Sequence, residues 1–270
     1  MKPKVRMTDQ VTDPTGHQLF QSERQQEILS LTHDRGRVEV SELAERFNVT
    51  TETVRRDLSE LQSQSLLRRV HGGAVPWETG RFEPLVSVRQ DQHDDEKRRI
   101  ARAAVNEVPD TGSVIIDSGS TLTRFAEAIP DIGVRVVTNC LPIAQTLADR
   151  ESLEVIVIGG KVRKNTLAMV DNAAIAAIEP VQVDTLFISS DAATPATGLT
   201  TPYREEAALK QAMIAAARRV VALVDHSKFG HDQFIRFARW ADIDVLVTNH
   251  ELDGAIVDAI EAMGTTVQLT

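Results

Sequence analysis

The chain has 270 residues, of which 42% are hydrophobic, and this length is typical of two domains with packed cores. No apolar run of about 18 residues could cross a membrane, and the basic N-terminus lacks the apolar stretch of a secretory signal, so we expect a cytoplasmic protein. The single cysteine, Cys140, excludes an intrachain disulfide and a thiolate zinc cluster, and the net charge of -9 excludes coating of nucleic acid by bulk electrostatics. We expect residues 1–20 to form a disordered tail.

Residues 21–75 have the pattern of a small helical unit that ends in a hairpin. We expect its first helix over residues 23–33, with Ser22 as the N-cap and Gly36 just beyond the end. After a short extended piece, a second helix is predicted to begin at Ser41, where apolar residues again recur with helical spacing. These two helices supply one side of a small core.

A third helix is predicted to follow, capped by Thr50 or Thr51. Val54, Leu58 and Leu61 recur at a spacing that points their side chains into one core. The opposite face carries short hydroxyls and guanidinium groups, which can reach phosphates and base edges when a helix enters the major groove. The expected DNA contacts of this helix are Thr50, Thr51, Thr53, Arg55 and Arg56.

The hairpin that follows is a candidate wing. Residues 66–70 alternate as a strand does, and a Gly-Gly tip comes next, where the backbone can approach a phosphate closely. Between Arg55 and His71, four arginines stand against only two acids, Asp57 and Glu60, so this patch is locally basic in an acidic chain. The expected DNA contacts of the hairpin are Arg68, Arg69, His71 and Gly72.

The stretch from Arg24 to Val75 resembles the DNA-binding module of the DeoR family of bacterial transcriptional regulators. The resemblance rests on four segments in the family's order: RQQEILSL, SELAERFNVT, TVRRDLSELQ and RRVHGGA. It implies a winged helix-turn-helix that docks its third helix in the major groove. Two arginines alone on an amphipathic helix are more often solvated surface. The four segments in the family's order favour DNA binding instead.

We interpret residues 76–95 as a linker, because proline, glycine and many charges occur there without periodicity. From residue 96 to 270, short apolar strands alternate with helices, which predicts an α/β domain with a mainly parallel sheet covered on both faces. The expected strands are 113–117, 134–139, 153–160, 183–190, 220–225 and 245–249. The expected helices are 96–105, 122–129, 143–148 and 204–219.

Polar residues follow several of these strands, at the edge where α/β sheets bind ligands. The loop 117–121 joins a strand to a helix, so its glycine turn, its hydroxyls and the helix dipole favour a phosphate. Lys228 offers a point charge to the phosphate, and Asp191 or Asp225 offers an acceptor to sugar hydroxyls. Plain capping is the alternative for the loop and for Asp225. The expected effector contacts are Asp117, Ser118, Gly119, Ser120, Thr121, Thr138, Asn139, Gly160, Asp191, Lys210, Asp225 and Lys228.

The larger domain also resembles the DeoR family over about residues 81–250, through VIIDSGST, VVTNCLPIA, VIGGKVRKNT, GLTTPYREEAALKQAM and ALVDHSKFG. The resemblance implies a fold like that of ribose-5-phosphate isomerase, and a phosphorylated sugar that is sensed rather than converted. Residues 189–192 depart from the pattern by lacking the glycine that the family often has there. Residues 198–203 lack the lysine that isomerase-like enzymes carry before the long helix, which argues against catalysis.

The sequence therefore predicts a transcriptional repressor controlled by a phosphorylated sugar. We expect it to bind a double-stranded DNA operator as a homo-oligomer, because dimers read two half-sites. The alternative is a sugar-phosphate isomerase-like enzyme with Glu205 and Lys210 as base and cation, but both begin a periodic helix and turnover is not expected. A metal site at residues 93–96 is discarded because adjacent ligands on a linker rarely form a closed site, and no cofactor is expected.

Overall fold

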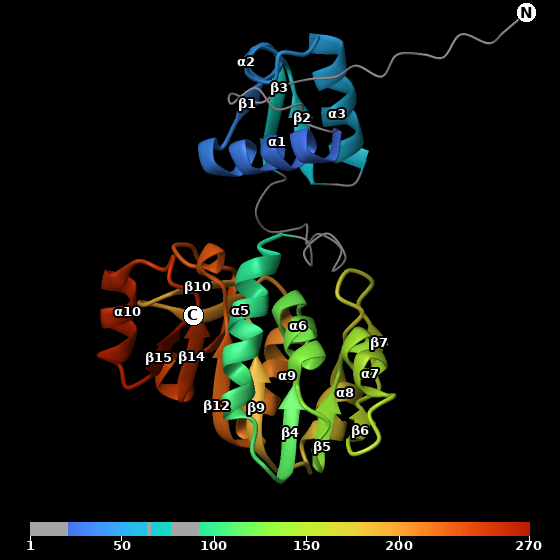
Figure 1. Ribbon diagram of the computed structural model, residues 1–270, viewed down its shortest axis with the longest axis vertical. Helices are drawn as coiled ribbons and strands as arrows, with labels where there is room; N and C mark the ends of the chain where they lie inside the picture. The colour runs from blue at the N-terminus through green and yellow to red at the C-terminus, as the bar shows by residue number, and fades with distance from the viewer. Residues whose placement is uncertain (1–20, 64–65, 77–91) are drawn as a thin grey trace, which may run out of the picture. The chain divides into compact units, whose positions relative to one another are not determined.

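The computed structural model describes three stretches of the chain, residues 21–63, 66–76 and 92–270. The chain divides into two compact units, Met1–Pro84 and Leu85–Thr270 (Figure 1). The expected tail, residues 1–20, and most of the expected linker, residues 76–95, lie outside the described residues. The bounds of the four segments expected from the sequence therefore stay a prediction.

The smaller unit is a winged helix-turn-helix, in which helices pack against an antiparallel sheet of order β1-β3-β2 (Figure 1). The three positions expected to face the core, Val54, Leu58 and Leu61, are buried. Ser22 lies inside the first helix, so its prediction as N-cap is wrong, because the helix begins before it. The elements are α1 (Gln21–Arg35), β1 (Val38–Glu39), α2 (Val40–Arg46), α3 (Thr51–Ser63), β2 (Leu67–Val70) and β3 (Gly73–Pro76).

The sheet of the smaller unit depends on a glycine in the hairpin. Gly73 begins β3 and pairs with Glu39 of β1. A Cβ at Gly73 would lie 1.9 Å from the carbonyl oxygen of Val38, so any side chain would separate the two strands. The Gly-Gly tip expected from the sequence therefore serves strand pairing as well as the turn.

The larger unit is built on a parallel sheet of seven strands among the described residues, in the order β15-β14-β12-β9-β4-β5-β6. Successive residues of β4 point into different cores, Ile115 to one face and Val114 and Ile116 to the other, as a strand buried on both faces requires. The expected parallel α/β fold is confirmed. The strands are β4 (Gly112–Ile116), β5 (Val134–Thr138), β6 (Glu154–Val157), β9 (Val183–Ile188), β12 (Ala217–Leu223), β14 (Val245–Thr248) and β15 (Thr266–Leu269).

Helices cover the two faces of this sheet (Figure 1). Residues of α5, α6 and α7 share a core with one face, and residues of α8, α9 and α10 share a core with the other. The predicted helix 204–219 is too long: Arg219 belongs to β12, where it pairs with Thr185 of β9, so strand pairing overrides the helical pattern. The helices are α5 (Asp94–Ala104), α6 (Ser120–Ala128), α7 (Leu141–Leu147), α8 (Asn172–Ile178), α9 (Arg204–Ala215) and α10 (Gly254–Glu261).

Short elements that were not expected complete the larger unit. One is a hairpin that returns the chain from the end of β6, and another is a small antiparallel sheet of order β10-β11-β13. The short strands are β7 (Lys161–Val162), β8 (Met169–Val170), β10 (Ala192–Thr194), β11 (Gly198–Thr201) and β13 (Ile235–Ala238). The 3₁₀ turns are η1 (Val105–Glu107), η2 (His226–Lys228) and η3 (Trp240–Asp242).

Candidate functional site

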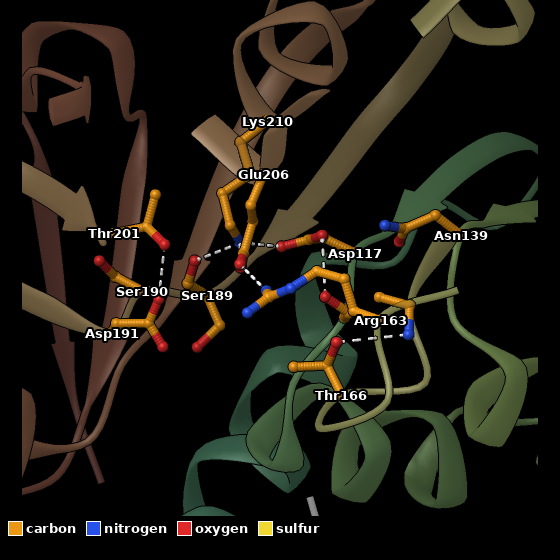
Figure 2. A network of polar contacts seen from close by, with 12 residues as sticks. Asp117, Asn139, Arg163, Thr166, Ser189, Ser190, Asp191, Thr201, Glu206 and Lys210 are labelled. Carbon is orange, nitrogen blue, oxygen red and sulfur yellow. Dashed lines mark hydrogen bonds and ion pairs between the residues drawn. The ribbon is translucent and has the colours of Figure 1, made fainter. Parts of the chain in front are cut away.

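The strand order of the large sheet reverses between β4 and β9, with β5 and β6 on one side and β12, β14 and β15 on the other. Open α/β sheets bind ligands at such a reversal, outside the carboxyl ends of the strands. Residues 117–121 follow β4 and residues 189–191 follow β9, and a Cβ at Gly119 would lie 3.6 Å from the Cβ of Ser189. Figure 2 shows polar side chains of both loops together with Asn139, which follows β5.

A buried ion pair forms the centre of this polar network. The ammonium of Lys210, on α9, pairs with the carboxylate of Asp117 (Figure 2). Lys210 Nζ also donates to the carbonyl oxygen of Ser189 at 3.0 Å and lies 3.7 Å from Glu206 Oε1. Burial opposes the charged form of Lys210, but the carboxylates of Asp117, Glu206 and Asp191 outweigh it and raise the pKa of Lys210. Lys210 therefore stays charged and joins α9 to the loops after β4 and β9.

The hairpin of β7 and β8 is attached to the start of α9. Arg163 forms an ion pair with Glu206, and its guanidinium lies 3.9 Å from the centre of the Tyr203 ring. Lys161 Nζ lies 3.0 Å from Glu205 Oε2 at the surface, so the candidate base of the enzyme alternative points to a surface lysine. Neither Arg163 nor Glu206 was expected at the site, because charged residues in a basic run or in a first helical turn are usually solvated.

The loop 117–121 leads directly into α6. Gly119 is the N-cap of the helix, with a φ of +144° that favours glycine, and it offers no side chain to the N–H groups of the first turn. Ser118, Ser120 and Thr121 are buried beside these N–H groups. Backbone N–H groups, hydroxyls and the positive end of the helix dipole thus converge where an anion can accept hydrogen bonds.

Asn139 contributes a hydrogen-bond acceptor that has no partner. Its Nδ2 donates to the carbonyl oxygen of Met169 at 3.1 Å, whereas its buried Oδ1 accepts no hydrogen bond within the described residues. A buried polar atom without a partner is uncommon and points to a donor from outside the chain. Thr138 Oγ1 accepts from the N–H two residues on, at 3.1 Å, and Gly160 turns the chain between β6 and β7 with a φ of +152°. These two residues shape the loops beside Asn139.

The loop after β9 is held to β11 by side chains. Ser190 Oγ donates to the carbonyl oxygen of Ala192 at 2.7 Å and accepts from the N–H of Thr200 at 3.2 Å. Asp191 Oδ2 accepts from Thr201 Oγ1 at 2.8 Å. The stretch that departs from the family pattern is therefore a wall fixed by its own hydrogen bonds, and one oxygen of Asp191 already has a donor.

Asp225 and Lys228 lie beyond the end of β12. The buried carboxylate of Asp225 accepts from the N–H and the hydroxyl of Ser227 and so caps η2, which is the capping alternative considered from the sequence. Burial opposes the charged carboxylate, but Lys228, Ser227, Lys97 and His93 outweigh it and lower the pKa of Asp225. The hydrogen bonds of Asp225 hold its own loop rather than the network around Asp117.

The described part of the chain contains no group of three or more His, Cys, Asp or Glu side chains placed to hold a metal ion. In the stretch 93–96, Asp94 instead bonds to Arg98 and Arg124, each at 2.6 Å. None of the described helices is both long enough and apolar enough to span a membrane.

The candidate DNA-contacting face of the smaller unit is formed by α3. Thr50 caps the helix, because its Oγ1 accepts from the N–H of Thr53 at 3.1 Å. Thr51, Arg55 and Arg56 are exposed, and Thr53 is half-buried. The face opposite the core thus carries the hydroxyls and guanidinium groups expected from the sequence.

The wing lies beside the end of α3. Arg69 Nη1 donates to Ser59 Oγ at 2.6 Å, and the N–H of Arg69 donates to Gln62 Oε1 at 3.0 Å, so Arg69 ties the wing to α3. The carbonyl oxygen of Gly72 accepts from the N–H of Val40 at 2.8 Å, and that of His71 accepts from a more distant Arg37 at 3.4 Å. Arg68, also on β2, is exposed.

A buried ion pair holds α3 to α1. Arg24 Nε lies 2.6 Å from Asp57 Oδ2, and both side chains are almost fully buried. Asp57 is one of the two acids between Arg55 and His71. Its carboxylate is buried and neutralised by Arg24. Of the two acids counted between Arg55 and His71, only Glu60 is therefore exposed, so the surface of that stretch is more basic than the sequence count indicates.

A winged helix-turn-helix followed by an α/β unit with a polar network at its carboxyl edge defines a class, the DNA-binding regulators that carry their own sensor domain. The model of the DeoR-like helix-turn-helix domain matches residues 24–79, and that of the DeoR C terminal sensor domain matches residues 92–250. The chain belongs to the DeoR family.

The relatives include regulators that match along almost their whole length. The chain is 34% identical over 250 residues to the HTH-type transcriptional regulator GlpR of Haloferax volcanii, covering 92% of this chain and 98% of that protein. It is 32% identical over 236 residues to the glycerol-3-phosphate regulon repressor of Escherichia coli, covering 85% and 91%. Ribose 5-phosphate isomerase A of Methanocaldococcus jannaschii is similar in structure, with a TM-score of 0.39 and 18% identity over 52% of this chain and 56% of that chain. The chain is a transcriptional regulator.

Proposed function

We propose that this regulator represses genes of carbohydrate metabolism and that a phosphorylated sugar or polyol, bound at the reversal between β4 and β9, sets its hold on the operator. The observation that carries the proposal is the juxtaposition of an anion-competent helix start at residues 117–121 with the unpartnered acceptor Asn139 Oδ1. One feature suits a phosphate, and the other suits a hydroxyl.

The phosphate end of the ligand lies on the loop 117–121. Backbone N–H groups and the hydroxyls of Ser120 and Thr121 donate to its oxygens, and the helix dipole adds an attraction of fixed direction. The hydroxyl of Ser118, which donates to Asp117 Oδ1 at 3.5 Å, turns from that oxygen to the phosphate. An unpaired carboxylate at Asp117 would repel a phosphate bound on the same loop. The ion pair with Lys210 neutralises this carboxylate. Lys210 therefore acts on the ligand through Asp117, by making the loop neutral.

The hydroxyl end of the ligand lies toward Asn139 and Asp191. Asn139 Oδ1 accepts from one hydroxyl, which removes the cost of a buried acceptor without a partner. Asp191 accepts from a second hydroxyl beside its bond to Thr201. Thr138, Gly160 and Asp225 shape the surrounding loops, and Lys228 adds positive charge at the rim. Because one relative is a glycerol-3-phosphate regulon repressor, glycerol 3-phosphate is one compound to test.

The smaller unit reads the operator through α3 and the wing, with Arg55 and Arg56 toward base edges or phosphates. One winged helix buries little surface on DNA, so two copies on two half-sites are needed for a specific affinity. Ligand binding favours an arrangement of the copies that no longer matches the half-sites, and the DNA is released. Because its target is chromosomal DNA, we place the protein in the cytoplasm.

Thermal unfolding of the full-length protein against a panel of phosphorylated compounds tests the effector site. The panel holds sugar phosphates and glycerol 3-phosphate, each beside its unphosphorylated parent. A ligand at 100 times its Kd stabilises the folded state by about 2.7 kcal/mol, so we expect a shift of several degrees with one phosphorylated member and none with its parent.

The variant Ser120→Asp places a negative charge on the anion loop and should abolish the shift. The control is Thr266→Asp, which adds the same charge at an exposed position of β15 and should respond like the wild type. Equal shifts with phosphorylated and unphosphorylated partners, or an unchanged response of Ser120→Asp, would contradict a phosphate site at this loop.

A further inference from the structure

Exposed apolar side chains gather at one edge of the larger unit. Of the eight large hydrophobic residues that are exposed in the described part of the chain, five lie between residues 141 and 167. Figure 1 shows α7, β6 and β7, which carry four of these five residues, together at one side of the unit. We call residues 141–167 the β6 edge. Its exposed large hydrophobic residues are Leu141, Ile156, Val157, Val162 and Leu167.

The β6 edge combines an apolar groove with the end of a sheet. A groove of about 540 Å³ runs between α7 and β6, and Leu141, Ala144, Leu153, Val155 and Val157 line it. β6 is the last strand of the described sheet and pairs only with β5. Its outer N–H and C=O groups are therefore a template for another strand, and such edges in monomers are usually blocked by charges or prolines. Three of the four residues of β6 are valine or isoleucine instead.

The charges of the β6 edge are segregated along the strand direction. Asp149 and Glu151 precede β6, and Lys164 follows β7. Within the described residues, none of these three side chains takes part in an ion pair. Arg150 lies between the two acids and donates to the carbonyl oxygens of Ile129 and Glu127, so one negative charge remains in excess at that end. The edge is thus acidic at one end, apolar in the middle and basic at the other end. Two such edges match when they run antiparallel, because each acidic end then meets a basic end.

We propose that a second copy of this chain docks on the β6 edge, with the two β6 strands antiparallel about a two-fold axis near Ile156. A two-fold contact joins the same patch on both copies, so the patch must complement itself, and an apolar centre with opposite charges at its ends does so. The inference rests on the proposed function in one respect, the need for two copies on two half-sites.

The mass of the full-length protein in solution, measured by sedimentation at micromolar concentration, tests the inference. The wild type is expected at twice the chain mass of 29.7 kDa, or at a higher even multiple. Val157→Glu puts a charge on the axis of the contact and should halve that mass. Met263→Glu changes a residue of similar exposure, 41% against 45%, away from the edge and should keep the wild-type mass.

A charge exchange tests the antiparallel arrangement. Glu151→Lys and Lys164→Glu each place like charges opposite one another at two symmetric points, so each should weaken association by about five- to tenfold. The double variant restores opposite charges and should recover most of the wild-type affinity. Single variants that associate like the wild type, or a double variant weaker than both, would overturn the antiparallel arrangement.

The outcomes separate this inference from the proposed function. If the wild type associates and Val157→Glu keeps its mass, the β6 edge is the wrong surface, while an oligomeric regulator still stands. A monomeric wild type overturns both the edge and the oligomer. The effector site is independent of either result, because the thermal shift of Val157→Glu with the phosphorylated panel reports on the loop 117–121 alone.

Discussion

Charged residues at the carboxyl edge of the sheet are bound to polar side chains of the same protein. Lys210 neutralises Asp117, Arg163 pairs with Glu206, and Asp225 serves its own turn through Ser227. The residue types after each strand indicate a polar site from the sequence alone. Their pairing does not follow from the sequence, because Lys210 and Asp117 lie 93 residues apart and meet only when α9 packs on the sheet.

At this scale we predict that Lys210→Met lowers the free energy of unfolding by about 3–5 kcal/mol, because it leaves the buried carboxylate of Asp117 without its partner. Urea denaturation of the full-length protein measures the change. The control is Lys161→Met, which removes a surface ion pair with Glu205 and should cost at most about 1 kcal/mol. Equal effects of the two variants would contradict a buried charge pair at Lys210.

The same pair predicts a pH dependence. The pKa of Lys210 is raised in the folded protein, so its contribution is fully present below the unfolded lysine value of about 10.4 and is lost as pH rises through the folded value. The difference in stability between the wild type and Lys210→Met should therefore be constant near neutral pH and narrow only in strongly alkaline solution. If this difference in stability narrowed between about pH 6 and 8, where histidines titrate, Lys210 would not be the group responsible.

Helices and strands were predicted best where periodicity was strong. The spacing of Val54, Leu58 and Leu61 identified α3, and short apolar runs identified six strands of the parallel sheet, all but β15. Predicted boundaries are wrong where pairing between distant strands decides them. Arg219, for example, belongs to β12 because it pairs with Thr185 of β9. The β7–β8 hairpin escaped prediction because its strands are two residues long and its basic run has the composition of a loop.

The exposed face of α3 leads to a prediction on DNA binding. Arg55→Ala and Arg56→Ala should each weaken binding to a fragment selected from genomic DNA by about 1–3 kcal/mol at fixed salt, since each removes a guanidinium from the face that enters the groove. Fluorescence anisotropy measures the affinity. Arg218→Ala, an exposed arginine on β12 of the larger unit, is the matched control and should bind like the wild type. Unchanged affinity of both α3 variants would rule out this docking.

At the scale of the whole molecule, the sequence indicated the fold class and the family, but not the strand order. The reversal between β4 and β9 depends on pairings such as Val114 with Thr185, which no local pattern encodes. That reversal is what brings Asp117, Ser189 and Asn139 to one place. The candidate residues were therefore predictable as a set of strand ends, whereas their division into loop-shaping and ligand-facing groups needed the structure.

Binding of the ligand to the larger unit should control DNA binding by the smaller unit. DNA affinity measured with and without the ligand tests this control most directly. The measurement titrates full-length protein onto the selected DNA fragment in the presence of the phosphorylated compound that raises thermal stability. We predict that a saturating concentration weakens DNA binding by about 5–150-fold, the usual range of allosteric coupling, and that Ser120→Asp shows no response. An affinity that stays the same while the compound still raises thermal stability would contradict a ligand-controlled regulator.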